Sequence, residues 1–280
     1  MANTIGYGQG AVNNTNDWGQ GAKVGASESL LLDSYSGASV AYSLRKLSSS
    51  YSGSAIRVRR SSDNTEQDIG FTGNELDTTS LTSFVGANDG YVTRWYDQSG
   101  NANNSAQATA TVQPQIVSSG TVLTNNSKPS MFLENQDSLT FTTLTPITTF
   151  TVAKIDTLNY AIHYVLFNNV STKGYFYGGT FTGVNGLGIY DGSAKSITGE
   201  DTNTHLGYFN YNGTNYEVAK DGSSISNLAS GSNFDLNYIG RQQTSLTLNG
   251  QLQEIVIYPS TQSTNKSNIE SNINTYYSIY

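Results

Sequence analysis

Alternation of apolar and polar residues dominates the chain from about residue 113 onward. Short runs rich in β-branched and aromatic residues are separated by turn residues, which is typical of strands with two different faces. The predicted strands are Ser130–Leu133, Leu139–Phe141, Thr148–Ile155, Tyr164–Phe167, Tyr175–Tyr177, Gly188–Tyr190, His205–Tyr211, Tyr216–Lys220, Asn237–Ile239, Ser245–Leu248 and Gln251–Tyr258. Asn212-Gly213 and Asp221-Gly222 have the composition of tight hairpin turns. Strands at this density, without intervening helices, predict an antiparallel sandwich of two sheets.

Two segments have the period of a helix instead. Val40, Leu44 and Leu47 recur at i, i+4 and i+7, which predicts a short amphipathic helix over residues 38–48. Near the end of the chain, residues 268–277 place four apolar side chains on one helical face, namely Ile269, Ile273, Tyr276 and Tyr277. Ser267 and Glu270 have the spacing of a capping box at its start. We expect this terminal helix to pack on the sandwich.

The first 26 residues differ from the rest of the chain. Tyr7-Gly-Gln-Gly-Ala11 returns as Trp18-Gly-Gln-Gly-Ala22, and six glycines in the first 25 residues disfavour a stable core because ordering glycine is costly. A flexible leader and a docking arm are both compatible with this composition. The repeated aromatic unit favours a docking arm over residues 1–26, followed by one domain over 27–280. The expected contacts of the arm are Tyr7, Gln9, Trp18 and Gln20.

Composition and charge narrow the classes of function. Of the 280 residues, 36% are aliphatic or aromatic, 12% are charged, and the net charge of −7 argues against a nucleic-acid partner. The absence of cysteine excludes disulfides and thiolate metal sites, and fits synthesis in a cytoplasm. The N-terminus lacks the basic and apolar regions of a signal peptide, and no apolar run is long enough to span a membrane.

A tight corner follows a strand-like run in Tyr91-Val-Thr-Arg-Trp-Tyr-Asp-Gln-Ser-Gly-Asn101. Aspartate, serine and asparagine can bond their own backbone, so Asp97 is expected to be mainly structural and a sugar or Ca²⁺ ligand only as the alternative. An aromatic ring can stack on the apolar face of a sugar. The ligand-binding candidates of the chain are Trp95, Tyr96, Asp97, Gln98, Asn101 and Gln242.

Three blocks of sequence carry a resemblance to a known family. They are Tyr42-Ser-Leu-Arg-Lys-Leu47 with Ile56-Arg-Val-Arg-Arg-Ser-Ser-Asp-Asn64, Trp95-Tyr-Asp-Gln-Ser-Gly-Asn101 with Gln113-Pro-Gln-Ile-Val117, and Asn249-Gly-Gln-Leu-Gln-Glu-Ile-Val-Ile-Tyr258 with the terminal helix. Over residues 30–280 the chain resembles the catalytic domain of the α-L-arabinofuranosidase B family. The resemblance implies a concanavalin A-like (laminin-G-like) fold, here an all-β, two-sheet antiparallel jelly-roll sandwich with a short C-terminal helix and a Gly-rich N-terminal arm.

The resemblance also implies a retaining glycosidase, which needs two carboxyl groups at the glycosidic bond. In the family pattern the acid follows a Gly-Gly pair before the last strand, but the matching Gly240-Arg-Gln-Gln243 has no carboxyl. The family's nucleophile is a mid-chain glutamate, and the matching stretch offers only Asp191. An amide such as Gln242 cannot donate and recover a proton. We therefore do not transfer the family's catalytic residues to this chain.

Other carboxylates and the histidines offer weaker candidates. Glu254 lies in a strand on an apolar face, where its carboxylate must be paired or protonated; a structural partner such as arginine is favoured over a role as an acid. Loop carboxylates such as Glu200 and Asp201 could face a groove. Two histidines without cysteine make a zinc site improbable, so we expect no metal and no cofactor.

The arginine strand has two interpretations. Ile56 and Val58 alternate with arginines, which predicts a half-buried strand. Arg57, Arg59 and Arg60 are expected to pair with acidic residues, and contact with an acidic glycan is the alternative. The expected acidic partners are Asp63, Asp68 and Asp97.

The corner and the Ile-Asn-Thr-Tyr-Tyr ending also resemble domains of phage virion proteins and of bacterial surface proteins. The leading expectation is a non-enzymatic, homo-oligomeric virion component: a fibre, spike or capsid-decoration subunit at the virion surface, synthesised in the host cytoplasm. Its arm would bind other virion subunits, and its domain would contact host-surface glycans. The alternatives are a retaining glycosidase of arabinofuranosidase type with a relocated carboxyl pair, and a purely structural module.

Overall fold

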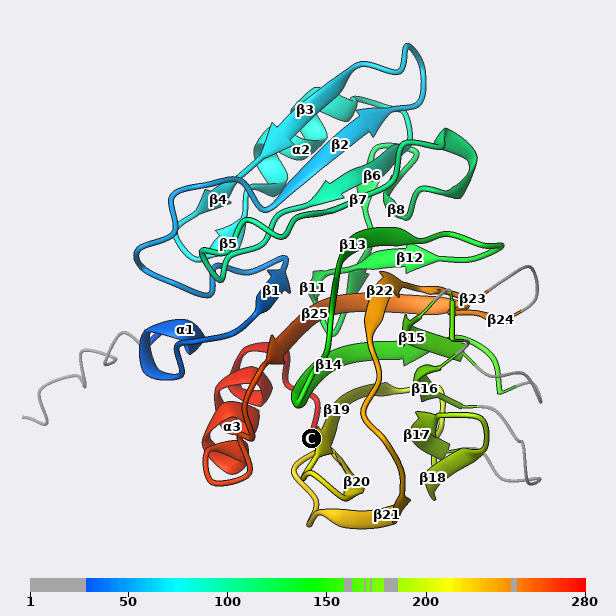
Figure 1. Ribbon diagram of the computed structural model, residues 1–280. Coiled ribbons are helices and arrows are strands. Elements are labelled where there is room, and N and C mark those ends of the chain that lie inside the picture. Colours follow the sequence, from blue (N-terminus) through cyan, green and yellow to red (C-terminus); the bar gives the residue numbers. More distant parts are fainter. Residues whose placement is uncertain (1–28, 159–162, 169, 172, 179–185, 243–245) are drawn as a thin grey trace, which may run out of the picture.

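The structure, a computed structural model, describes residues 29–158, 163–168, 170–171, 173–178, 186–242 and 246–280, and most of its regular structure is β (Figure 1). The helices are α1 (Leu31–Ser34), α2 (Thr78–Val85) and α3 (Lys266–Tyr277), with a 3-10 turn at Ala110–Val112. The strands are β1 (Val40–Ser43), β2 (Ile56–Arg60), β3 (Glu66–Ile69), β4 (Phe71–Thr72), β5 (Glu75–Leu76), β6 (Gly90–Trp95), β7 (Ser105–Ala106), β8 (Gln115–Ser118), β9 (Thr121–Val122), β10 (Thr124–Asn125), β11 (Lys128–Pro129), β12 (Met131–Leu133), β13 (Leu139–Leu144), β14 (Thr148–Ile155), β15 (His163–Phe167), β16 (Gly174–Tyr177), β17 (Gly186–Tyr190), β18 (Ala194–Thr198), β19 (Thr204–Tyr211), β20 (Asn215–Lys220), β21 (Ser226–Ser230), β22 (Leu236–Ile239), β23 (Arg241–Gln242), β24 (Leu246–Thr247) and β25 (Gly250–Tyr258). Among the described residues, no helix is long and apolar enough to cross a membrane.

Two antiparallel layers form the body of the molecule. In the first layer the strands run β21–β20–β19–β14–β25–β1, and β12 pairs with the other half of β25. In the second layer they run β18–β17–β16–β15–β22–β13–β7. Strand β6 pairs with β2, β7 and β8, and so connects both layers to a smaller sheet with β3 and helix α2 at one end of the molecule (Figure 1).

The main core lies between the two layers. The stacked rings of Tyr175 in β16 and Phe209 in β19, with centroids 4.5 Å apart, join the layers directly. Along β25, Ile255 and Ile257 belong to this core, whereas Val256 and Tyr258 belong to a second cluster beneath α3. This period of two is the alternation visible in the sequence, because successive strand side chains point to opposite faces. Both faces of the first layer are therefore buried.

Most sequence expectations for the fold are confirmed. The predicted strands, the hairpins at Asn212-Gly213 and Asp221-Gly222 and the terminal helix are all present; of the predicted strand Ser245–Leu248, β24 contains Leu246–Thr247, and Ser245 lies outside the described residues. The fold is an all-β antiparallel sandwich of jelly-roll type with a short C-terminal helix, as predicted. Residues 1–26, the expected docking arm with Tyr7, Gln9, Trp18 and Gln20, lie outside the described residues.

Two local expectations were wrong. Residues 38–48 contain strand β1 rather than a helix, and Val40 pairs with Ile257 of β25. All four β1 residues are buried, so a solvent-facing helical side never forms, and pairing with a distant strand overrides a weak local period. The predicted capping box is absent because α3 begins two residues earlier than expected, at Lys266, whose ammonium binds Glu270 at 2.7 Å.

Candidate functional site

The polar corner after β6 is held by one buried carboxylate. Asp97 accepts hydrogen bonds from the backbone N–H groups of Ala41 (2.8 Å), Ser99 (2.9 Å) and Asn103 (3.1 Å). It also accepts from the Ser99 hydroxyl at 2.8 Å, and it is only 3% exposed. The carboxylate therefore links β1 to the corner and is structural, which was the favoured interpretation.

The other corner candidates divide into buried and surface residues. Trp95 is fully buried against Tyr42, so its ring has no face available to a sugar in this fold. Gln98 is also buried and bonds the backbone at Leu47 and residues 43 and 45. Tyr96 donates to Asp68 at 2.7 Å near the surface, and Asn101 is exposed. A binding role for Tyr96 and Asn101 stays a prediction.

Three further candidates lie apart from the corner. Glu254 is buried and receives Arg45 Nε at 2.8 Å and Nη2 at 3.0 Å, which confirms the favoured structural pairing with an arginine. Asp191 is largely buried and forms an ion pair with Lys195. The backbone of Gln242 lies in β23, and its side chain is outside the described part of the chain.

The arginines of β2 take separate partners. Arg57 Nε lies 3.4 Å from an oxygen of both Glu66 and Asp68, and Arg60 binds Asp63 at 2.6 Å, as expected. The expectation for Arg59 was wrong, because it forms no ion pair with an acid among the described residues. It is 9% exposed and lines a cavity, and its terminal nitrogens donate to Asn64 Oδ1 at 2.9 Å and to the Ala110 carbonyl oxygen at 3.3 Å.

This cavity, which we call the Asp137 pocket, has a volume of about 370 Å³. It is lined by Arg59, Tyr91, Ala110, Thr111, Gln113, Gln115, Phe132, Glu134, Asn135 and Asp137. Arg59 Nε donates to Gln113 Oε1 at 2.7 Å, and its guanidinium lies 4.9 Å from the centre of the Tyr91 ring. The arginine is thus fixed by an amide and an aromatic face before any ligand enters.

Two carboxyl groups lie in the turn that closes the Asp137 pocket. Asp137 N–H donates to the carbonyl oxygen of Glu134 at 2.7 Å, and Glu134 N–H donates to Asp137 Oδ2 at 3.1 Å. Burial raises the pKa of Asp137 to about 6; the Glu134 N–H opposes this rise, and the negative charge of Glu134 adds to it. Glu134 itself is exposed. The pocket therefore holds one carboxyl that keeps its proton in mild acid and another that faces solvent.

The glycine before the unmatched acid position supports this turn. Gly240 has φ +86°, and a Cβ added there would lie 2.3 Å from Leu133 Cδ2 and 2.9 Å from the carbonyl oxygen of Asp137. Only glycine adopts this φ readily and leaves room for the turn. Three stretches that carry or were compared with the family resemblance therefore come together near the Asp137 pocket. Arg59 and Gln113 line the pocket, and Gly240 lies against its turn.

A second group of carboxylates surrounds His205. Its Nδ1 lies 2.6 Å from Asp221 Oδ2, and its Nε2 lies 3.0 Å from Asp201 Oδ1 and 3.8 Å from Glu200 Oε1. Burial opposes the positive charge on His205, but the bond to Asp221 and the charge of Glu200 outweigh it and raise the pKa of His205. Asp201 and Asp221 line a polar cavity of about 550 Å³, as the sequence allowed for Asp201.

The exposure of the protonated carboxyl distinguishes the His205 group from the Asp137 pocket. Burial raises the pKa of Glu200 to about 7, but its side chain has no exposed surface. A hydrolase needs a protonated carboxyl that reaches the glycosidic oxygen. The Asp137 pocket meets this condition better, because both of its carboxyls line the cavity. Among the described residues, neither group forms a set of ligands suited to a metal ion.

Sequence reasoning missed Glu134 and Asp137. The available signal was a pair of carboxyls three residues apart, directly after the predicted strand Ser130–Leu133. Carboxylates in turns are usually solvated, so this signal is weak without coordinates. What makes the pair unusual is the burial of Asp137 by segments distant in sequence.

Comparison with known proteins supports the family resemblance over part of the chain. Residues 34–140 match the family described as alpha-L-arabinofuranosidase B, catalytic. None of the curated proteins compared matches the sequence. A mutant GH54 α-L-arabinofuranosidase soaked with 4-nitrophenyl α-L-arabinofuranoside superposes with a TM-score of 0.71 at 16% identity. An arabinofuranosidase complexed with arabinofuranosyl-alpha-1,2-xylobiose gives a TM-score of 0.69 at 15% identity.

Both superpositions cover 87% of this chain and 64% of the solved chain. They establish the shared fold, but the chain spans less than two-thirds of the length of those proteins. The matched family describes a catalytic domain, and the solved structures are arabinofuranosidases. The expectation of a non-enzymatic phage virion component, with its roles in host attachment and capsid decoration, was therefore wrong.

Proposed function

We propose that this protein is a glycoside hydrolase of arabinofuranosidase type, with its catalytic carboxyls in the Asp137 pocket. One observation carries the proposal: a cavity lined only by residues of the matched segment 34–140 contains two carboxyl groups in different environments. In many enzymes two carboxyl groups in different environments take different roles, one as the acid and the other as the base or nucleophile. The absence of a carboxyl in Gly240-Arg-Gln-Gln243 is consistent with a pair on the adjacent turn.

Each residue of the pocket has a role in this proposal. Asp137, with a pKa of about 6, acts as the acid that protonates the leaving oxygen. Glu134 is the second carboxyl, which attacks the anomeric carbon or activates water. Arg59 donates to sugar hydroxyls from its fixed position, and the half-buried Phe132 ring contacts the apolar face of the sugar.

Hydrolysis of 4-nitrophenyl α-L-arabinofuranoside tests the proposal. We expect the unsubstituted protein to release nitrophenol, and Asp137→Asn to lower kcat by about 10²–10⁴-fold, because removal of a general acid has effects of that size. The rate should fall as pH rises above about 6, where Asp137 loses its proton.

The matched control is Asp201→Asn, which removes one carboxylate from the His205 cavity. It should leave kcat within about twofold of the unsubstituted value if the chemistry lies at Asp137. Loss of activity in Asp201→Asn with activity retained in Asp137→Asn would move the site to His205. A folded protein that releases no nitrophenol at any pH would refute the hydrolase proposal.

A further inference from the structure

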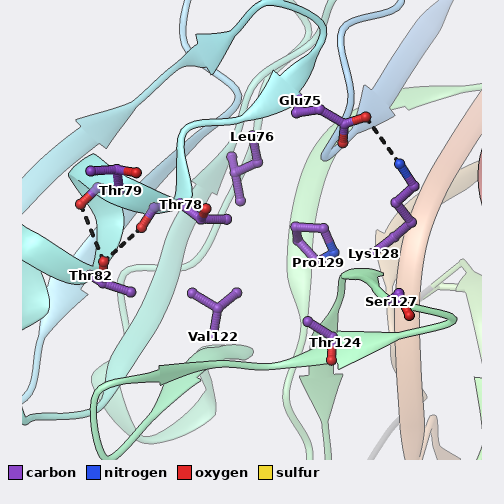
Figure 2. Close-up of a pocket in the computed structure, with 10 residues that line it drawn as sticks. All are labelled: Glu75, Leu76, Thr78, Thr79, Thr82, Val122, Thr124, Ser127, Lys128 and Pro129. Atoms are coloured by element: carbon purple, nitrogen blue, oxygen red, sulfur yellow. Dashed lines mark hydrogen bonds and ion pairs between the residues drawn. The ribbon is translucent and has the colours of Figure 1, made fainter.

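Two adjoining cavities form a cleft between the α2 region and the sandwich. The larger, of about 530 Å³, is shown in Figure 2, and the smaller, of about 300 Å³, continues from it toward α3. Both are lined by Glu75 and Lys128, whose ion pair of 3.0 Å therefore lies where they meet. We call the combined space the lysine cleft.

The larger cavity has walls suited to a neutral polar ligand. Thr78 and Thr79 line one side and Thr124 and Ser127 the other, all with hydroxyl groups (Figure 2). Leu76, Val122 and Pro129 supply apolar surface between these walls. A sugar ring has polar hydroxyl groups at its edge and an apolar C–H face. Hydroxyl walls with apolar surface between them can therefore contact both parts of the ring.

The smaller cavity has a positive charge in excess. Arg45, Lys46 and Lys128 line it together with one acid, Glu75. The charge of Arg45 is neutralised by buried Glu254, and that of Lys128 by Glu75. Within the described part of the chain, Lys46 has no ion pair or side-chain hydrogen bond, so one unneutralised cation faces a cavity in a protein of net charge −7.

Tyr276 holds the neighbouring cations in place. Its ring centre lies 3.9 Å from Lys128 Nζ and 4.9 Å from the Arg45 guanidinium carbon, and its hydroxyl donates to Glu75. Cation–π contacts and the hydrogen bond restrict these side chains without the help of a ligand. Lys46 is therefore the charge left for an incoming anion.

We propose that the lysine cleft binds a saccharide that carries a carboxylate. The carboxylate of a uronic acid residue lies at Lys46 in the smaller cavity, and a neighbouring neutral sugar lies between the hydroxyl walls of the larger one. The smaller cavity is at the lower end of the volumes found for small-molecule sites, which suits one sugar unit. This site is separate from the Asp137 pocket and does not depend on hydrolysis.

Matched pairs of sugars test the proposal. D-Galacturonate and D-galactose differ only in the carboxylate at C6, and their dissociation constants can be measured by NMR titration of the ¹⁵N-labelled protein at low salt. We expect galacturonate to bind about fivefold more tightly than galactose, the size expected for one partly exposed ion pair. The preference should shrink as salt is added, because salt screens exposed charges.

Lys46→Gln should remove the preference for galacturonate and leave the binding of galactose unchanged. Lys173→Gln is the control, because it removes the same charge from a position beside Phe234, outside the cleft. Equal affinity for the two sugars, or an unchanged preference in Lys46→Gln, would overturn the proposal. Inorganic phosphate that binds more tightly than galacturonate and competes with it would also overturn it, in favour of a general anion site.

Discussion

Glu200 allows the electrostatics of this fold to be tested with one substitution. Its carboxylate oxygens have no hydrogen-bond partner among the described residues, and the nearest cations are His205 at 3.8 Å and Lys220 at 3.6 Å. Glu200→Gln keeps the shape of the side chain and removes its ability to ionise. The difference in pH dependence between the two proteins therefore reports the cost of ionising Glu200 together with its effect on His205.

The magnitude follows from the pKa. Burial raises the pKa of Glu200 from 4.5 to about 7, while His205 and Lys220 oppose the rise. A difference of about 2.5, at about 1.4 kcal/mol for each unit of pKa, corresponds to about 3.5 kcal/mol. Because the folded value is raised, the folded state binds the proton more tightly. The contribution of protonated Glu200 to the free energy of unfolding is fully present below pH 4.5 and is lost as the pH rises through about 7.

Urea denaturation at pH 5, 6, 7 and 8 measures this loss. Between pH 5 and pH 8, the free energy of unfolding of the unsubstituted protein should fall by about 2.5 kcal/mol more than that of Glu200→Gln, because a part of the total is already lost at pH 5. Removal of Glu200 also lowers the pKa of His205, which changes the comparison in the same direction. Parallel pH profiles for the two proteins would show that Glu200 is not buried in this way.

Three further substitutions test the fold. Glu254→Gln leaves the Arg45 guanidinium buried without its carboxylate and should lower the free energy of unfolding by about 3–5 kcal/mol in urea denaturation. Glu66→Gln, at the exposed pair with Arg57, should cost less than about 1 kcal/mol; equal effects of the two would contradict the assigned burial. Gly240→Ala forces a Cβ against Leu133 and should cost about 1–3 kcal/mol by thermal denaturation, with a loss of the proposed hydrolase activity. Unchanged stability and activity in Gly240→Ala would show that the turn does not depend on this glycine.

The sequence predicted the elements that depend on neighbouring residues, and it failed where an element depends on residues far along the chain. The strands could be predicted because alternation along β14 and β25 is a local property of the chain. Residues Val40–Ser43 could not, because their strand exists only through pairing with β25, more than 200 residues away. Asp97 was correctly expected to be structural, since the residues of its turn are adjacent in sequence.

The candidate site was less predictable for a physical reason. Arg59, Gln113 and Gly240 belong to stretches that the family resemblance had drawn attention to. No spacing rule predicts that Arg59 and Gln113 line one cavity or that Gly240 lies against its Asp137 turn. Glu134 and Asp137 look like ordinary solvated acids in the sequence. Only the packing around them removes water from Asp137 and raises its pKa.

The sequence by itself determined an all-β chain with a terminal helix, and a family resemblance to an arabinofuranosidase domain, because period and turn chemistry are encoded in neighbouring residues. The tertiary structure decided which charges are buried, paired or left to face a cavity. Glu254 meets Arg45 across 209 positions, whereas Lys46, the next residue after Arg45, meets no acid among the described residues. Desolvation and pairing depend on segments brought together by folding, so the chemistry of each site follows from the packing.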